Sequence, residues 1–264
     1  MSASSESANF SSLAKVIANK VPEATIAFWV IKILCTTIGE TAADFLNTNL
    51  HLGLTGTTLV MSVFLIAAMI AQFKSNTYAP IRYWAVVVLV SVVGTLITDN
   101  LTDNFGVSLI TTTAIFSVLL ATVFGAWYAV EKTLSIHAIN TVRREIFYWL
   151  TILCTFALGT ASGDLISERL NWGYFTAAVF FAAIIAVITL AHKAFGLNAV
   201  FAFWIAYIVT RPLGASIGDL LSQSKSDGGL GLGTVGTSAL FFVAICISVY
   251  FLTRTTEHIE SSNQ

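Results

Sequence analysis

The sequence predicts an all-α membrane protein whose eight transmembrane helices form four two-helix repeats. Three observations lead to this prediction. The chain of 264 residues is 56% hydrophobic and only 10% charged, whereas a soluble domain has about 25% charged residues. It contains eight apolar stretches, each long enough to cross roughly 30 Å of hydrocarbon as a helix. One pattern of tryptophan, glycine and aspartate at fixed spacing occurs four times.

The eight expected spans follow one another with short connections. A soluble helical bundle would need polar positions every three or four residues, which these stretches lack. A transmembrane β-barrel would need shorter segments in which polar and apolar residues alternate. We therefore expect helices at residues 24–46, 54–73, 81–101, 107–130, 145–166, 174–191, 197–221 and 235–252.

The first, third, fifth and seventh spans carry the repeated pattern. In each copy a glycine follows a tryptophan by ten residues, and an aspartate follows the glycine by five. The copies are Trp29–Gly39–Asp44, Trp84–Gly94–Asp99, Trp149–Gly159–Asp164 and Trp204–Gly214–Asp219. Successive glycines are 55, 65 and 55 residues apart. This spacing predicts a two-span unit duplicated twice, with two four-helix halves at 24–132 and 133–253.

The second, fourth and eighth spans open with hydroxyl-rich stretches. These are "GLTGTT" at 53–58, "TTT" at 111–113 and "GTVGTS" at 233–238. We expect their hydroxyls to add to a polar lining near the outer face. The seventh span differs from the others in containing Pro212, which lacks a backbone donor, so a kink or break is expected there.

Basic residues indicate how the spans are oriented. Only Arg169 and Lys225 lie in the loops opposite the two termini. The positive-inside rule therefore places both termini in the cytoplasm. Polar tails at 1–23 and 254–264 flank the spans, and the first lacks the apolar core of a cleaved signal peptide. The residues on the side of the termini are Lys15, Lys20, Lys74, Arg82, Lys132, Arg143, Arg144, Lys193 and Arg254.

Four segments carry a resemblance to a known family. They are "FWVIKILCTTIGETAADFLN", "YWAVVVLVSVVGTLITDNLTDN", "YWLTILCTFALGTASGDLIS" and "FWIAYIVTRPLGASIGDLLSQ". The chain resembles bacterial membrane proteins built from four tandem two-helix repeats, each marked by a tryptophan, over residues 24–252. The resemblance implies this fold plan and a bacterial inner membrane as the location. The family is not defined by an established activity, so the resemblance assigns no functional residue.

The repeated glycines and tryptophans have simple structural interpretations. We expect the glycines at helix contacts, because another small residue follows each one by four positions, namely Ala43, Thr98, Gly163 and Gly218. Local unwinding beside the aspartates is the alternative. The tryptophans are expected at the cytoplasmic interface, where aromatic belts form. Each aspartate would then lie about 22 Å further along its helix, in the outer third of the bilayer.

Carboxylates within the spans are the strongest functional signal. An ionised side chain at the bilayer centre costs at least about 2.5–3.5 kcal/mol, so such residues usually face a polar interior. We expect Asp44, Asp99, Asp164 and Asp219 to converge on one axial cavity, together with Glu40 and with Asp103, which stands one turn beyond Asp99. The four aspartates would ligate a hard cation such as Mg²⁺ or Mn²⁺. No histidine or cysteine stands beside them, which disfavours Zn²⁺ and Cu⁺.

Lys32 and Arg211 are the bases that share these helices. Five acids at depth against these two bases leave a buried charge of −3 if all are ionised, so protons, a cation or water must compensate. In the structural alternative, the aspartates cap the following helices or pair with the two bases. An anionic substrate or an enzymatic role is a third possibility. Glu40 and Arg211 each occur in one repeat alone, which marks them as functional exceptions, although an ion pair between them would also explain them.

We therefore predict a secondary transporter for a small cation, with divalent metal efflux as a candidate activity and proton coupling on Glu40 or the aspartates. The alternative is a non-transporting membrane protein, a sensor or an intramembrane enzyme, in which the carboxylates are structural. The sequence has no ATP-binding motif and no G-x-S-x-G or HExxH motif. We expect no enzymatic activity and no cofactor other than a bound cation. The expected partners are the lipid bilayer, the cation and the proton, and the net charge of −1 gives no sign of nucleic acid.

Overall fold

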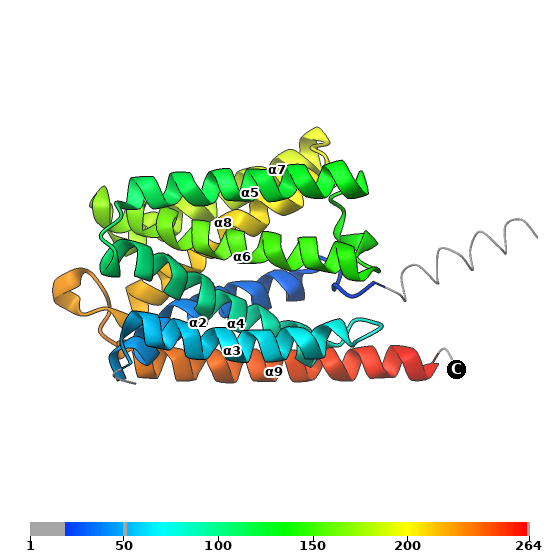
Figure 1. Ribbon diagram of the computed structural model, residues 1–264, viewed down its shortest axis with the longest axis horizontal. Helices are drawn as coiled ribbons and strands as arrows, with labels where there is room; N and C mark the ends of the chain where they lie inside the picture. The colour runs from blue at the N-terminus through cyan, green and yellow to red at the C-terminus, as the bar shows by residue number, and fades with distance from the viewer. Residues whose placement is uncertain (1–18, 50–51, 263–264) are drawn as a thin grey trace, which may run out of the picture.

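The computed structural model is a bundle of long helices and describes residues 19–49 and 52–262 (Figure 1). Eight of these helices are long and apolar enough to cross a membrane. The described part of the chain contains no strand, so the predicted all-helical membrane fold is confirmed. The helices are α2 (Ile26–Asn49), α3 (Gly53–Phe73), α4 (Pro80–Asp99), α5 (Leu109–Glu131), α6 (Val142–Asp164), α7 (Gly173–Phe195), α8 (Ala199–Ser222) and α9 (Gly233–Ser262).

Local sequence explains where several helices begin and end. Pro80 begins α4, where its missing N–H is not needed. The side chain of Asn198 caps α8 by accepting hydrogen bonds from the N–H groups of Val200 and Phe201. Gly196 ends α7 in the left-handed conformation, with φ of 70°. The helix α9 continues to Ser262, so much of the expected C-terminal tail is helical.

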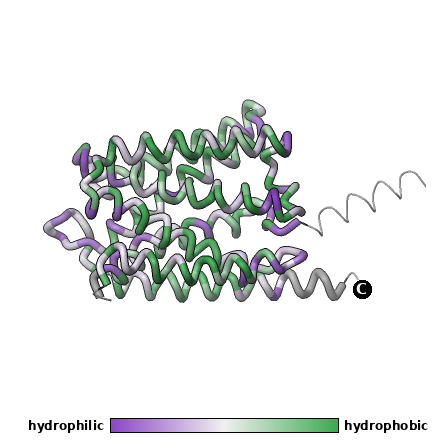
Figure 2. Tube along the Cα trace, in the orientation of Figure 1, coloured by the Kyte–Doolittle hydropathy of each residue, from purple (hydrophilic) through white to green (hydrophobic). Residues whose placement is uncertain are grey.

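The helices form two shells. Between 61% and 67% of the apolar window is buried in each of α2, α4, α6 and α8, against 6% to 22% in α3, α5, α7 and α9. The four helices that carry the repeated pattern are therefore the inner shell, and the other four cover it. Figure 2 shows apolar residues along the lengths of the helices and polar ones mainly at the two ends of the bundle, as expected when lipid surrounds the outer shell.

The repeats interlock in a closed circle. Around the inner shell, α2 contacts α4, α4 contacts α6, α6 contacts α8, and α8 contacts α2. Each outer helix packs chiefly on the inner helix of the following repeat: α3 on α4, α5 on α6, α7 on α8, and α9 on α2. The expected division of the chain into two four-helix halves near residue 133 was inferred from the spacing of the repeats, and this division stays a prediction.

The repeated glycines make the contacts between neighbouring inner helices. A methyl group added at Gly39 would collide with Ser91, one at Gly94 with Phe156, one at Gly159 with Arg211, and one at Gly214 with Thr36. Each of these partners stands three residues before the repeated glycine of the next inner helix. One close contact thus recurs four times around the circle, and the expectation of glycines at helix contacts holds.

Pro212 does not break α8, and the kink expected there stays a prediction. The helix is continuous from Ala199 to Ser222. The small surface of α6 faces the proline ring: a methyl group at Gly159 would lie 3.1 Å from Pro212 Cδ, and one at Gly163 would lie 3.5 Å from its Cβ. The sequence therefore accommodates the proline by placing glycines on the neighbouring helix.

The prediction that the tryptophans form an interfacial belt is wrong. Trp84, Trp149 and Trp204 are only 2% to 4% exposed, and Trp29 is half-buried. They belong to an aromatic cluster inside the bundle, in which Trp149 lies 5.4 Å from the ring of Tyr83. The inner helices have little lipid-facing surface because the outer shell covers them, so a tryptophan on an inner helix is buried in protein.

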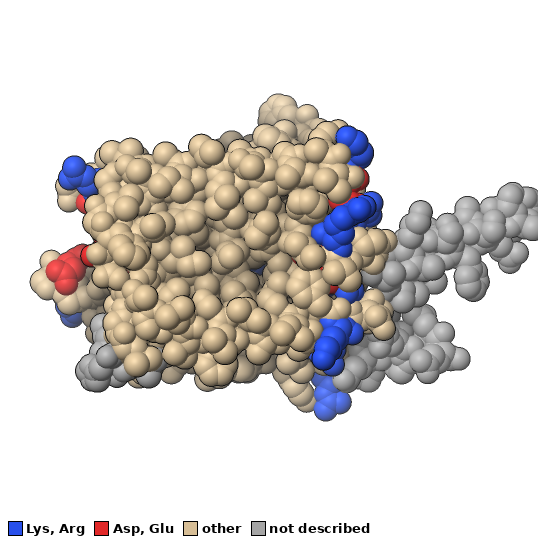
Figure 3. All heavy atoms as spheres, viewed as in Figure 1, with Lys and Arg blue, Asp and Glu red and all other residues tan. Residues whose placement is uncertain are grey.

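Most surface lysines and arginines gather at one end of the bundle, which we call the basic end (Figure 3). The described chain enters at residue 19 near this end, and α9 ends there (Figure 1). Lys20, expected in a polar tail, is buried and pairs with Glu145 at 2.8 Å. Its Nζ also donates to the carbonyl oxygen of Phe73. Lys20, a residue of the expected first tail, therefore binds α3 and α6 at the basic end. Lys15 lies outside the described residues.

Replacing a contact glycine should destabilise the bundle. In the Gly94→Ala variant, the new methyl group would meet Cβ of Phe156 and the backbone N of Ala157. Overpacking of this kind costs about 1–3 kcal/mol, and we expect a lower melting temperature in detergent. Gly125→Ala is the matched control, because a methyl group there meets nothing within 4 Å. Equal melting temperatures for the two variants would contradict this assignment.

Candidate functional site

The polar residues of the inner shell lie in layers across its axis. The position after each repeated glycine holds Glu40, Thr95, Thr160 or Ala215, and the position one turn earlier holds Thr36, Ser91, Phe156 or Arg211. All eight of these side chains are at least nine-tenths buried. Because the repeats are related around the circle, equivalent positions meet at the same depth.

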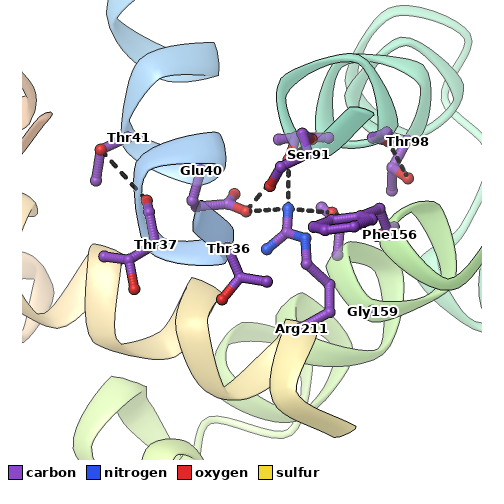
Figure 4. Close-up of polar contacts among 12 residues, drawn as sticks. Thr36, Thr37, Glu40, Thr41, Ser91, Thr98, Phe156, Gly159 and Arg211 are labelled. Carbon is purple, nitrogen blue, oxygen red and sulfur yellow. Dashed lines mark hydrogen bonds and ion pairs between the residues drawn. The ribbon is translucent and has the colours of Figure 1, made fainter. Parts of the chain in front are cut away.

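Arg211 crosses the axis and meets all three other inner helices (Figure 4). Its Nη2 donates to Glu40 Oε2 on α2 at 2.7 Å and to Thr160 Oγ1 on α6 at 2.7 Å. The same nitrogen also contacts Thr95 Oγ1 on α4. The guanidinium lies beside the ring of Phe156, with Cζ 5.8 Å from its centroid. The ion pair between Glu40 and Arg211, left open by the sequence, is therefore present.

Lys32 lies nearer the basic end than Arg211 and is fully buried. Its Nζ donates to the carbonyl oxygen of Tyr207 at 2.9 Å and to Thr210 Oγ1 at 2.5 Å. The ammonium also lies 4.0 Å from the ring centroid of Tyr207. Within the described residues no carboxylate forms a salt bridge with Lys32, so this lysine is held by neutral groups.

The carboxylates cluster on the other side of Arg211. Glu40, Asp164 and Asp219 come from three inner helices, and each offers an oxygen within 4.8 Å of the other two. Asp44 and Asp99 also lie close enough to Glu40 to interact with it electrostatically. The four aspartates are therefore neighbours of Glu40, and their convergence on one axial cavity stays a prediction. We call these five residues the acid cluster.

The members of the acid cluster differ in their exposure. Glu40 and Asp219 are each 6% exposed, whereas Asp44, Asp99 and Asp164 are half-buried. Asp103 is exposed at the end of its helix, yet it remains among the charged neighbours of Asp44 and Asp99. Solvent access therefore decreases from the rim of the cluster toward Glu40.

The structural alternative for the aspartates receives little support. Among the described residues, no salt bridge joins Asp99, Asp164 or Asp219 to Lys32 or Arg211. None of these three carboxylates caps a following helix through a hydrogen bond, again within the described residues. These aspartates are held near one another without a neutralising base.

Hydroxyls of the outer helices α3 and α9 form hydrogen bonds with residues of the inner shell, and their expected contribution to a polar lining stays a prediction. Hydroxyls of α3 bind Asn100 at the end of α4: Thr55 Oγ1 donates to its Oδ1 at 2.9 Å, and its Nδ2 donates to Thr58 at 2.7 Å. On α9, Ser238 donates to Thr41 of α2 at 2.8 Å. These hydroxyls join the outer shell to the inner one, because each outer helix packs on the following repeat.

Two short π-helical segments were not predicted. They continue α4 and α6 directly after Asp99 and Asp164, as η1 (Asn100–Asn104) and η3 (Leu165–Arg169). They occupy equivalent positions in the second and third repeats. Segments of this kind are frequent at functional sites, and here they lie beside two members of the acid cluster.

Comparison with known families agrees with this arrangement. Residues 27–78, 82–133, 147–196 and 202–257 each match the family described as "Repeat of Unknown Function (DUF347)". The chain belongs to this family. Each DUF347 match covers one inner helix and the outer helix that follows it, so the expected four two-helix repeats are confirmed. No curated protein and no solved structure matches the chain.

The DUF347 repeats thus bring together two kinds of site residue. Carboxylate oxygens from several helices offer the ligands that hard cations prefer. The guanidinium of Arg211 neutralises Glu40 and holds it in place at the deep end of the cluster. The arrangement can bind a cation or protons, and ion binding by Glu40, Asp44, Asp99, Asp103, Asp164 and Asp219 stays a prediction.

Removing Arg211 alone should lower the free energy of unfolding more than removing both Arg211 and Glu40. In Arg211→Gln, Glu40 keeps its charge in a buried site without its partner, which costs about 3–5 kcal/mol. The Glu40→Gln/Arg211→Gln double variant should lose less than the sum of the two single losses in free energy of unfolding. Reversible unfolding in mixed micelles measures all three values.

Arg143→Gln provides the control for this cycle. Arg143 pairs with Glu131 on the surface, and its side chain is 68% exposed, so its loss should cost at most about 1 kcal/mol. Strictly additive effects of Glu40→Gln and Arg211→Gln would contradict a direct ion pair.

Proposed function

We propose that this membrane protein is a secondary transporter for a small cation, with the acid cluster as its binding site. The observation that carries the proposal is the approach of Glu40, Asp164 and Asp219 within 4.8 Å of one another. Like charges so close repel strongly in a low-dielectric interior. A bound cation or proton relieves that repulsion.

The chemistry of the cluster favours a hard divalent cation. All the candidate ligands are carboxylate oxygens, which suit Mg²⁺ and Mn²⁺. Carboxylates also bind protons, so a cation and protons can compete for the same groups. This competition is the simplest form of proton coupling, and it makes efflux driven by a proton gradient the candidate activity.

A non-transporting role is the second candidate. Arg211 fastens four helices together at the base of the cluster, which would also suit a sensor that binds a cation without moving it. An intramembrane enzyme is less well supported, because the clustered groups are carboxylates with no nucleophile assigned among them. Binding without flux distinguishes the sensor from the transporter.

Loss of one carboxylate should weaken both cation binding and transport. Asp164→Asn and Asp219→Asn preserve side-chain volume but remove a charged ligand, so each should reduce Mn²⁺ affinity by at least about tenfold. Titration calorimetry on purified protein measures binding, and proteoliposomes with a pH gradient measure flux. Asp227→Asn is the control, because this exposed acid lies in a loop. Unchanged binding and flux in both cluster variants would refute the site.

We also propose that the basic end faces the cytoplasm of a bacterial inner membrane, as the positive-inside rule indicates. Ser226 lies in the exposed loop between α8 and α9, and Ser135 lies in the connection between α5 and α6. A membrane-impermeant maleimide added to intact cells should label Ser226→Cys but leave Ser135→Cys unlabelled until the cells are opened. The reverse labelling pattern would invert the topology.

A further inference from the structure

A second charged region lies on the basic-end side of Glu40. Lys32 and Arg211 are both fully buried, and they are close enough for Arg211 to act on Lys32 electrostatically. Both cations contact the same ring, since Lys32 Nζ lies 5.4 Å and Arg211 Cζ 5.8 Å from the centroid of Phe156. Among the described residues, one carboxylate forms a salt bridge with these two cations: Glu40, which pairs with Arg211. The ammonium of Lys32 is therefore left without a carboxylate partner in this part of the chain.

Several hydrogen-bond donors in this region have no partner. Arg211 uses only Nη2, and its Nε and Nη1 are buried without an acceptor among the described residues. The hydroxyls of Ser91 and Tyr207 are likewise buried and unpartnered there. Ser91 occupies the same layer as Arg211, and Tyr207 the same layer as Lys32. Unsatisfied buried groups are rare and indicate an ion or water in their midst.

We propose that a small monovalent anion of the chloride class binds beside Arg211 and Lys32, on the side of Glu40 away from the aspartates. An anion accepts hydrogen bonds from donors that lack acceptors, and it pairs with the ammonium of Lys32, which has no carboxylate partner among the described residues. A water molecule would satisfy the donors but would leave this ammonium without a counter-ion, which is costly in a buried site. The site does not depend on cation transport and would exist in a sensor as well.

The surroundings restrict what this site accepts. The rings of Phe156 and Tyr207 lie against the cations, and the donors are at most 1% exposed. A large organic anion would have to displace these rings. A single negative charge matches the one ammonium, that of Lys32, which has no carboxylate partner among the described residues, so halides are favoured over divalent sulfate.

The first test uses the stability of the purified protein. At constant ionic strength, replacing gluconate by chloride or bromide should raise the melting temperature in a saturable way, whereas sulfate should not. Lys32→Met should abolish the shift, and Lys32→Arg should retain it because the charge remains. Lys225→Met, in an exposed loop, should behave like the unaltered protein. A halide shift of equal size in Lys32→Met would overturn the proposal.

The second test locates the ion directly and does not depend on any variant folding. Crystals of the unaltered protein grown in bromide should give an anomalous peak within hydrogen-bonding distance of Nε or Nη1 of Arg211. Absence of a peak at saturating bromide would overturn the anion site. Neither result bears on Mn²⁺ binding, so this proposal and the transport proposal fail independently.

Discussion

One nitrogen atom, Nη2 of Arg211, meets side chains from every other inner helix. This contact is possible only because the repeated glycines let the inner helices approach closely, and Gly159 makes room for the stem of Arg211 itself. Glu40 supplies the charge and the two threonines supply neutral acceptors at the equivalent position. The pairing therefore fixes both the depth of Glu40 and the spacing of the helices, on which the geometry of the acid cluster depends.

The charged groups inside the bundle are sorted by sign. From the basic end the axis passes an aromatic cluster, then Lys32, then Arg211 with Glu40, and then the aspartates. The ion pair lies at the boundary between a positive and a negative region. Such sorting creates a strong local field along the axis, because the surrounding protein and lipid screen it poorly. A mobile ion at either region would change the energy of the other.

Much of this structure could be predicted from the sequence, because it depends on patterns along the chain and does not require knowledge of which helices pack together. Span length, repeat spacing and the singular occurrence of Glu40 and Arg211 are of this kind. The burial of the tryptophans and the partners of the outer hydroxyls were not predicted, because both depend on which outer helix covers which inner helix. Each outer helix covers the inner helix of the next repeat, and the spacing of the repeats does not reveal this arrangement. Thr95 and Thr160 could have been found, since they occupy the position of Glu40 in their own repeats.

The closed circle also has a consequence for biogenesis. Because α9 packs on α2, the first of these eight spans to be synthesised obtains its covering helix only when the last of them has been made. Lys32 and Glu40 on α2 likewise lack their partners on α8 until the seventh span has been made. The same closure restricts evolution, since losing a single outer helix would leave the inner helix of the next repeat uncovered. Helices are therefore expected to be gained or lost as whole repeats.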